Sequence, residues 1–307
     1  MAGREVTILG TSSQLPTRFR NHNGAFLRWD RLGFIFDPGE GTQRQMTHFG
    51  VKASQIQHIA LTHFHGDHCL GVPGLIQRMV GDGVSHDVHA WFPDSGAEYF
   101  KRLRYSSIYD EGHLSLEEHP LPVAPGVAWE TSEVTLTVQP LDHRVDAIGY
   151  RLQEKDSVRM LSDELAKRGI RGPDVAELMR EGRVVAPGGQ AVALEEVSVP
   201  RPGQSMAFIM DTRLCDSAIE LARGVDLLIT ESTFLESERK EAQRYAHMTA
   251  RDAAVLAREA DARLLLLTHF SQRYPDNQAF ADEASAIFPN VVAAEDGLTI
   301  EVPPRRS

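Results

Sequence analysis

Residues 62–68 read Thr62-His63-Phe64-His65-Gly66-Asp67-His68, which places three histidines and one aspartate close together. They follow the apolar run 59–61, which we expect to form a buried strand. Imidazole nitrogens and carboxylate oxygens suit zinc, and alternate residues of an extended segment, such as His63 and His65, point to the same side. The stretch therefore predicts a metal site at the end of a strand. The alternative is a polar surface turn in which these residues cluster by chance.

Polar residues also stand just beyond three later apolar segments, each of which we expect to be a strand. The segments and these residues are 207–210 with Asp211, 227–229 with Glu231, and 264–267 with His269. His143 has a comparable place, after Leu141-Asp142. A site for two ions that also admits water needs distant ligands, and these residues are the candidates. Position alone does not separate a ligand from a hydrogen-bonded residue or a turn former.

The rest of the chain predicts strands that alternate with helices. The expected elements are a strand at 6–10, a hairpin at 26–29 and 34–37, helical turns at 43–46 and 53–56, and a clear helix at 250–260. Such alternation favours helical layers packed outside sheets. We therefore expect an α/β fold, specifically an αββα four-layer sandwich, in a single domain over residues 1–307.

Residues 154–203 differ from the rest of the chain. Glycine and proline recur in this segment and interrupt a short polar helical stretch. Between Glu164 and Arg183, five basic residues face four acidic ones, so the net charge is small. We interpret the segment as a flexible arm inserted into the domain; a solvated pair of amphipathic helices is the alternative. The tail after Val302 is expected to fray.

Composition argues against several classes of protein. The 307 residues are 42% hydrophobic, enough for a full core, and the net charge of -11 argues against a generally basic nucleic-acid-binding surface. Any contact with nucleic acid must then be local. Two cysteines are too few for a disulfide framework, and the N-terminus has no signal-peptide pattern, which predicts a cytoplasmic protein. No apolar run approaches the roughly 20 residues of a membrane helix.

The pattern His63-x-His65-x-Asp67-His68 resembles the signature of the metallo-β-lactamase superfamily, which implies the αββα fold and metal-dependent hydrolysis. Lactamases, thioesterases, lactonases and nucleases share this pattern, so it leaves the substrate open. Further stretches resemble ribonuclease Z in order and spacing over nearly the whole chain. They are Phe36-Asp37-Pro38-Gly39-Glu40-Gly41-Thr42-Gln43-Arg44-Gln45, Asp211-Thr212-Arg213, Glu231-Ser232-Thr233-Phe234, Ala246-His247-Met248-Thr249 and Thr268-His269-Phe270-Ser271-Gln272-Arg273-Tyr274.

This resemblance implies a zinc-dependent endoribonuclease that removes the 3′ trailer from precursor tRNA and leaves a 3′-hydroxyl on the tRNA. It also implies two zinc ions per chain. The ligand sets that it implies are His63, His65 and His143 for one ion and Asp67, His68 and His269 for the other, with Asp211 bridging. The sequence departs from the family pattern at two positions. Arg18 stands where lysine is common, which keeps the charge but changes the geometry, and Thr230 stands where histidine often precedes Glu231.

Hydrolysis of a phosphodiester needs an activated water, a counter-charge and a proton for the departing oxygen. Asp67 can accept the proton of the attacking water. His247 is the candidate proton donor, because histidine titrates near neutrality and the resemblance places it at the site. Glu231 can orient His247. The alternatives are that His247 caps the helix that follows it and that Glu231 is only a member of a buried ion pair.

Several residues near these motifs have two explanations. Asp37 and Glu40 lie in a glycine-rich turn and either shape that turn or hydrogen-bond to a metal-bound imidazole, and we favour the hydrogen bond. The hydroxyls of Ser271 and Tyr274, near His269, either bind a phosphate or hold the loop. The remaining histidines, which we expect at the surface and outside the site, include His22, His86, His89, His113 and His119.

Local basic residues are the expected contacts with RNA. The candidates are Arg18, Arg20 and Asn21 after the first strand and Lys167, Arg168 and Arg171 in the arm. The stretch 169–173 resembles the glycine-proline tip of the tRNA-binding exosite of ribonuclease Z, which grips RNA by shape and phosphate contacts. The resemblance also implies a homodimer in which the arm of one subunit serves the active site of the other.

Two other functions remain open. A small-molecule hydrolase of the same fold, acting on a phosphodiester, lactone or thioester, leaves the arm and the arginines at 18–21 unexplained. A catalytically inactive, metal-containing RNA-binding subunit would be expected to lack a ligand, yet every implied ligand position is occupied. Mapping the 3′ end produced from precursor tRNA separates these functions.

Overall fold

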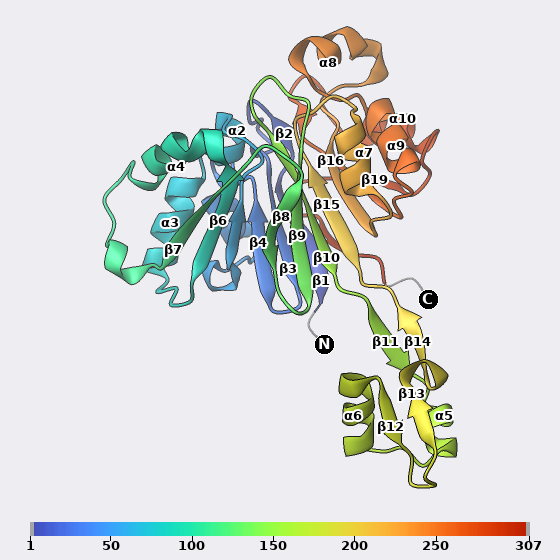
Figure 1. The fold of residues 1–307 in the computed structure, drawn as a ribbon. Helices are drawn as coiled ribbons and strands as arrows, with labels where there is room; N and C mark the ends of the chain where they lie inside the picture. The colour runs from blue at the N-terminus through green and yellow to red at the C-terminus, as the bar shows by residue number, and fades with distance from the viewer. Residues whose placement is uncertain (1–2, 305–307) are drawn as a thin grey trace. The chain divides into compact units, whose positions relative to one another are not determined.

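A computed structural model describes residues 3–304, which contain two seven-stranded sheets (Figure 1). The first sheet has the order β20 (Thr299–Glu301), β1 (Arg4–Gly10), β3 (Gly24–Trp29), β4 (Leu32–Phe36), β5 (His58–Ala60), β6 (Val88–Pro93) and β7 (Leu116–Leu121). The second has the order β19 (Val291–Ala293), β17 (Leu265–Thr268), β16 (Leu227–Glu231), β15 (Ser205–Ile209), β10 (Ile148–Glu154), β9 (Val134–Pro140) and β8 (Gly126–Glu130). A short parallel pair joins β2 (Ser12–Ser13) to β18 (Phe270–Ser271).

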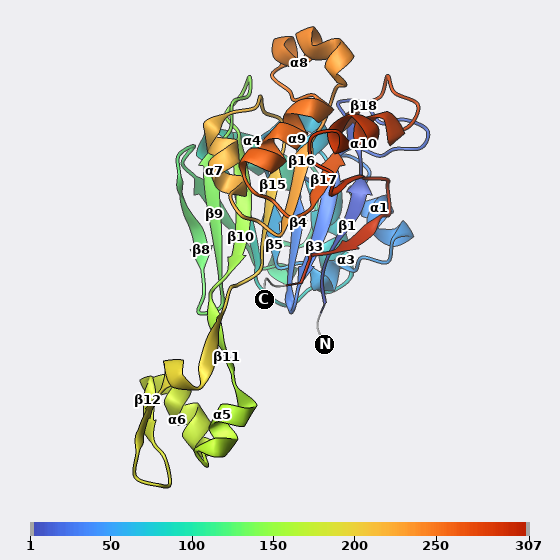
Figure 2. The same cartoon turned by 90° about the vertical axis from the view of Figure 1, so that its right-hand side faces the viewer.

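Helices cover the outer face of each sheet. The first sheet carries α1 (Thr42–His48), α3 (Val72–Gly81) and α4 (Ala97–Arg104), and the second carries α7 (Asp216–Ala222), α9 (Ala250–Glu259) and α10 (Gln278–Ser285) (Figure 2). The remaining helices of this unit are α2 (Gly66–Cys69), α8 (Arg239–Tyr245) and the short turns η1 (Ala53–Gln55), η2 (Asp94–Gly96), η3 (Glu111–His113) and η5 (Glu236–Glu238). The layers run helix, sheet, sheet, helix, which confirms the expected αββα sandwich.

Three apolar clusters hold the layers together. Between the sheets, the rings of Phe36 and Phe208 stack with their centroids 4.7 Å apart. Leu75 on α3 packs in the cluster under the first helical layer, and Leu256 on α9 packs in the cluster under the second. Complete burial of a side chain of this size contributes about 1.5–3 kcal/mol. Burial of the hydrophobic runs thus holds the strands in place, and this determines where the polar residues at the strand ends lie.

Within each sheet, the strand ends that carry polar residues lie at one edge because those strands are parallel. Strands β15, β16 and β17 pair in parallel, as do β4, β5 and β6. Asp211 follows β15, Glu231 ends β16, His269 follows β17 and His63 follows β5. Carboxyl ends of parallel strands lie at one edge of a sheet. The expected strands at 6–10, 26–29, 34–37, 59–61, 207–210, 227–229 and 264–267 and the helix at 250–260 are confirmed to within two residues at each end.

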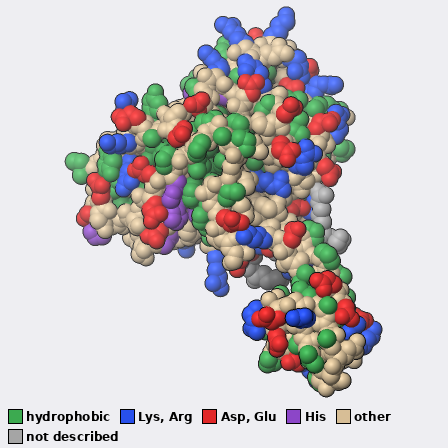
Figure 3. Space-filling view, in the orientation of Figure 1, with side chains coloured by type: hydrophobic (Ala, Val, Ile, Leu, Met, Phe, Trp, Pro, Cys, Tyr) green, Lys and Arg blue, Asp and Glu red, His purple; other side chains and the backbone are tan. Residues whose placement is uncertain are grey.

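Residues Glu154–Gln204, with Pro304, form a second compact unit. Its elements are β11 (Ser157–Met160), α5 (Ser162–Lys167), α6 (Pro173–Glu181), β12 (Arg183–Val185), β13 (Ala191–Ala193), η4 (Leu194–Glu196) and β14 (Ser198–Arg201). Leu165, Leu178 and Val192 are buried in a small core of its own. The segment thus contains two helices, α5 and α6, and a core that the polar, glycine- and proline-rich pattern did not indicate. Its surface mixes basic and acidic side chains (Figure 3).

No helix in the described part of the chain is long and apolar enough to cross a membrane. Of the tail expected to fray, residues 305–307 lie outside the described residues.

Candidate metal centre and active site

The histidine-rich segment leaves β5 as a loop and continues into helix α2. Asp37, which is fully buried, holds the start of this loop. Its Oδ1 accepts a hydrogen bond from the backbone nitrogen of Thr62, and its Oδ2 accepts one from Thr62 Oγ1, both at 2.7 Å. Beyond this anchor the rings of His63 and His65 converge, with His63 Nε2 2.9 Å from His65 Nδ1.

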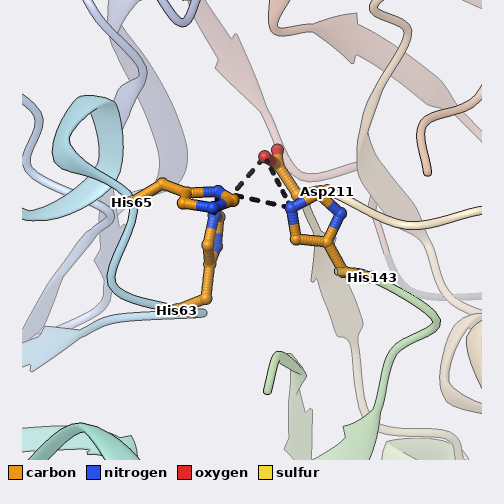
Figure 4. Close-up of side chains that lie close together, drawn as sticks. All are labelled: His63, His65, His143 and Asp211. Atoms are coloured by element: carbon orange, nitrogen blue, oxygen red, sulfur yellow. Dashed lines mark hydrogen bonds and ion pairs between the residues drawn. The ribbon is translucent and has the colours of Figure 1, made fainter. Parts of the chain in front are cut away.

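Four side chains form a first group of ligand atoms: His63, His65, His143 and Asp211 (Figure 4). His143 Nε2 lies 3.3 Å from His65 Nδ1. Asp211 Oδ2 lies 3.4 Å from His63 Nε2 and 3.7 Å from His143 Nε2. Bonds of about 2.1 Å to one ion place tetrahedral ligand atoms about 3.4 Å apart. The spacing of the group therefore fits one ion.

Asp67, His68 and His269 form a second group beside the first. His68 Nε2 lies 3.1 Å from His269 Nε2, and Asp67 Oδ2 lies 3.5 Å from the former and 3.4 Å from the latter. The second oxygen of Asp211, Oδ1, lies 3.4 Å from His68 Nε2 and 3.2 Å from His269 Nε2. Asp211 thus faces one group with each of its oxygens.

Hydrogen bonds at the far side of the rings fix which nitrogen points inward. His68 Nδ1 contacts Asp37 Oδ2 at 2.8 Å, and His269 Nδ1 contacts Thr233 Oγ1 at 3.0 Å. His143 Nδ1 lies 3.0 Å from the backbone oxygen of Ala246. A proton held on Nδ1 leaves Nε2 with a free lone pair for an ion. The geometry at Asp37 agrees with the hydrogen-bonding role expected for it.

Burial keeps two of the candidate ligand histidines in the form that can bind metal. Desolvation lowers the pKa of His65 and of His143 to about 4, so that both are neutral at physiological pH. Burial acts to raise the pKa of Asp67, but His68 and His269 together outweigh it and hold this pKa far below its usual range. Neutral imidazole and ionised carboxylate are the forms that coordinate an ion.

Two further features of these residues fit a bound cation. The buried Oδ1 of Asp211 has no hydrogen-bond partner among the described residues, although it faces two imidazole nitrogens. Asp37, Asp211 and His269 have positive φ angles of 43°, 44° and 60°. Such backbone conformations are uncommon outside glycine and persist where the surroundings enforce them. An unpaired buried oxygen and inward-facing nitrogens are what a cation between them would satisfy.

A pair formed by Glu231 and His247 lies beside the two candidate ligand groups. His247 Nδ1 is 2.9 Å from Oε1 of the fully buried Glu231. Glu231 also accepts hydrogen bonds from the backbone nitrogens of Thr212 at 2.8 Å and Met248 at 3.2 Å. Helix α9 is capped by Thr249, whose side chain accepts from the nitrogen of Asp252. His247 therefore does not cap that helix.

The ligand groups open into a cleft of about 550 Å³. The cleft reaches Asp67, His143, Asp211 and His247. Its wall includes residues that the sequence analysis did not select: Arg144, Phe234, Tyr245 and Arg273. Arg273 lies over the ring of Phe234, with its guanidinium carbon 4.9 Å from the ring centroid. Phe234 and Arg273 lie within the motifs quoted above, but the sequence alone did not indicate that they line the cleft.

The residues that we expected to contact RNA differ in how exposed they are. Arg18 is exposed, but Arg20 is buried and donates hydrogen bonds to the backbone oxygens of Ser271 and Tyr274 at 3.1 and 2.8 Å. Asn21 donates to the backbone oxygen of Glu40 at 2.9 Å. The two hydrogen bonds from Arg20 hold the loop that carries Tyr274, so Arg20 has a structural role.

Ser271 lines the cleft, whereas the Tyr274 hydroxyl is directed to the carboxylate of Glu238. In the second unit, Lys167 and Arg168 pair with Glu164 at 2.7 and 2.5 Å, and Arg171 is exposed.

One of the histidines expected at the surface, His22, is not there. His22 is buried under the glycine-rich turn after β4, with Nε2 3.2 Å from the backbone oxygen of Gln14, and it lines the cleft, so it lies neither at the open surface nor outside the site. His86 is half-buried and His113 is exposed. His89 and His119 are half-buried and lie beside each other on β6 and β7. Thr230, which stands where the family often has histidine, is buried, and its Oγ1 lacks a hydrogen-bond partner among the described residues.

Proteins of known family match this chain along its length. Two family profiles match parts of it: the Beta-lactamase superfamily domain over residues 194–270 and the Anti-Pycsar protein Apyc1 over residues 4–93. The ribonuclease Z of Nocardia farcinica is 52% identical over 100% of both chains. Those of Thermobifida fusca (49%, covering 100% of this chain and 97% of the relative) and Chlamydia muridarum (42%, covering 99% of each) are also similar.

Solved structures share the fold. The short form of human tRNase Z superposes with a TM-score of 0.73 at 24% identity, covering 98% of this chain and 100% of that one. A metallo-beta-lactamase fold protein from Bacillus subtilis superposes with a TM-score of 0.69 at 20% identity over 98% and 100%. The full-length likeness to curated relatives, on this fold and with these ligand groups, shows that the chain belongs to the ribonuclease Z family of the metallo-β-lactamase superfamily.

Proposed function

We propose that the chain hydrolyses the phosphodiester bond between a precursor tRNA and its 3′ trailer, which leaves a 3′-hydroxyl on the tRNA. Membership of the ribonuclease Z family makes it an endoribonuclease of tRNA 3′ processing. The observation that carries the finer assignment is the convergence of seven ligand side chains in two adjacent groups, with Asp211 facing both. Paired sites of this kind suit in-line displacement at phosphorus.

The ligand groups are assigned to two Zn²⁺ ions per chain. His63, His65 and His143 would hold one ion, and Asp67, His68 and His269 would hold the other, with Asp211 between them. The preponderance of imidazole favours zinc over magnesium or calcium. When bound, the ions would lower the pKa of a water molecule toward about 7 and neutralise charge on the phosphoryl oxygens.

The remaining steps belong to side chains of the chain itself. Asp67 lies at the cleft and would take the proton of the attacking water on its carboxylate. His247 would give its proton to the departing 3′ oxygen of the tRNA, and the buried Glu231 would hold the imidazole in place through Nδ1. The phosphate then stays on the trailer, so the bonds and protons balance.

The RNA would be held by local contacts, since the chain is acidic as a whole. Arg144 and Arg273 offer cations at the cleft, and the exposed ring of Tyr245 offers a face for base stacking. Arg18 would extend this surface. The second unit, through Lys167, Arg168 and Arg171, would bind tRNA by shape more than by charge, in a cytoplasmic homodimer whose subunits share this task.

Mapping the product of purified protein and precursor tRNA tests the reaction. The expected result is one new 3′-hydroxyl end at the start of the trailer, absent after chelation and absent from His143→Ala. Hydrolysis of bis(p-nitrophenyl) phosphate without cleavage of precursor tRNA would instead indicate a small-molecule hydrolase. Binding of tRNA without either activity would indicate an RNA-binding subunit.

Elemental analysis tests the metal assignment separately. The double variant His63→Ala/His269→Ala removes one ligand from each group and should contain two fewer zinc ions per chain than the wild type. An equal zinc content, or activity that survives chelation in the wild type, would contradict a two-ion centre. Sedimentation equilibrium of the same samples tests the homodimer.

A further inference from the structure

Strands β6 and β7 carry another group of metal-ligating side chains, formed by His89, Glu117 and His119 and called the edge cluster below. The two strands are parallel and in register, with His89 opposite Glu117. Residues two apart in a strand point to the same face, and so do residues paired across strands. The register of β6 and β7 therefore places all three side chains on one face, at the outermost strand of the first sheet.

The ligand atoms of the edge cluster are as close as those around a single ion. His89 Nδ1 lies 3.1 Å from His119 Nε2, and Glu117 Oε2 lies 3.3 Å from the former and 3.6 Å from the latter. Bonds of about 2.1 Å place neighbouring ligand atoms about 3.0 Å apart at right angles and about 3.4 Å apart in a tetrahedron. The three atoms thus form one triangular face of a coordination shell.

Aromatic contacts hold the two imidazoles in this orientation. The His119 ring stacks on Trp91, with centroids 4.1 Å apart and planes 17° apart. Trp91 is itself held by its Nε1, which donates a hydrogen bond to His58 Nδ1 at 3.2 Å. His58 stacks on His89 at 5.4 Å. Rings fixed in advance lose little freedom when an ion binds, which favours affinity.

The edge cluster is open to solvent on one side. The side chains of His89, His119 and Glu117 are 26%, 31% and 53% exposed. Figure 3 shows histidine and acidic side chains side by side over the part of the molecule where Figure 1 draws β6 and β7. An ion can therefore enter without local unfolding, and water can complete its shell.

The chemistry of the ligand atoms selects the class of ion. Two neutral imidazoles and a carboxylate suit zinc, nickel, cobalt or copper, whereas magnesium and calcium prefer oxygen ligands. We propose that the edge cluster is a further binding site for a divalent transition-metal ion, distinct from the seven-ligand centre, in which the ion ties the outermost strand β7 to β6. The inference does not depend on the ribonuclease activity.

Zinc content after equilibrium dialysis against a zinc buffer tests this site. The double variant His89→Gln/His119→Gln should bind one ion fewer per chain than the wild type and cleave bis(p-nitrophenyl) phosphate at the wild-type rate. The control His113→Gln alters an exposed histidine that also lies beside a carboxylate, with Nδ1 2.9 Å from Asp110 Oδ2, and should keep the wild-type zinc content.

Fluorescence locates the ion. Copper(II) bound at the edge cluster would lie beside Trp91 and quench its emission, and this quenching should disappear in the double variant and in Glu117→Gln, which leaves the stacked rings intact. Equal zinc content and equal quenching in the wild type and in Glu117→Gln would overturn the proposal. The 3.1 Å contact would then be an ordinary hydrogen bond between two imidazoles.

Discussion

Oε1 of Glu231 lies 2.9 Å from Nδ1 of His247, and this contact joins a fully buried carboxylate to an imidazole that reaches the cleft. Burial acts to lower the pKa of His247, but the charges of Glu231 and Asp211 and the hydrogen bond to Glu231 together outweigh it and raise that pKa to about 9. The imidazole therefore keeps its proton at neutral pH, as a donor to a departing oxygen must.

Replacement of His247 by alanine tests this role. His247→Ala should lower the single-turnover rate by roughly 10²- to 10⁴-fold, as expected for a lost general acid. The loss should shrink for a substrate whose leaving group is acidic, because such a group departs without a proton. Rapid-quench kinetics with precursor tRNA and with bis(p-nitrophenyl) phosphate measure both effects. An equal loss for the two substrates would contradict proton donation.

Asp67 should separate catalysis from binding. Its Oδ2 lies among the ligand atoms and also accepts a hydrogen bond from the backbone nitrogen of Gln14 at 2.6 Å. Asp67→Ala should abolish cleavage and leave the affinity for tRNA largely intact, since phosphate and shape contacts lie elsewhere. Asp142→Ala, which removes a nearby exposed aspartate, is the control and should keep most activity. Parallel losses of affinity and turnover in Asp67→Ala would argue against this division.

Removal of the second unit should weaken tRNA binding and spare the chemistry. The chain leaves β10 and returns to β15 at adjacent points, with the backbone nitrogen of Glu154 donating to the oxygen of Gln204 at 2.8 Å. Replacement of residues 155–203 by Asn-Gly should therefore close a hairpin without moving either strand. We expect a higher half-saturating tRNA concentration and unchanged hydrolysis of bis(p-nitrophenyl) phosphate. Unchanged affinity and rate with tRNA would show that the unit is not an exosite.

Asp296 should make stability depend on pH. Burial raises its pKa, although it accepts hydrogen bonds from the backbone nitrogen of Asn21 and from Thr11 Oγ1. The folded protein then holds this proton to higher pH than the unfolded chain does. The free energy of unfolding therefore falls as pH rises above the ordinary aspartate pKa of about 3.9. Asp296→Asn should remove this fall, so the variant gains stability relative to the wild type as pH rises.

Urea unfolding at a series of pH values measures the difference between Asp296→Asn and the wild type. Asp282→Asn changes an exposed aspartate and serves as the control, with no such trend. A difference that does not vary with pH would mean that Asp296 titrates alike in the folded and unfolded states.

The sandwich and the ends of its strands could be predicted because they depend on local patterns. The apolar run 59–61 ends two residues before His63, and the parallel pairing of β15, β16 and β17 brings Asp211 and His269 to one edge of the second sheet. Position alone did not decide whether each distant residue is a metal ligand, since a single polar residue after a strand can have several roles. Only the pairing of strands distant in sequence places the three together.

The structures that escaped prediction depend on contacts between distant segments. Arg20 lies in a basic motif, yet its guanidinium is buried against backbone oxygens more than 250 residues away in sequence, which no local pattern reveals. The small core around Leu165 and Leu178 combines apolar residues that are spread over residues 165–197. The edge cluster likewise needs the pairing of β6 with β7 to bring His89 beside Glu117.

The left-handed backbone at residues 37, 211 and 269 restricts which sequences evolution can place in this centre. Among residues with side chains, Asp, Asn and His are those most tolerant of positive φ, and these positions hold Asp, Asp and His. Asp211→Glu keeps the charge but lengthens the side chain by one methylene group and requires a backbone conformation that glutamate disfavours. The backbone conformation thus restricts the residue types at these positions independently of metal binding. We expect the same residue types there even in relatives that bind a different metal.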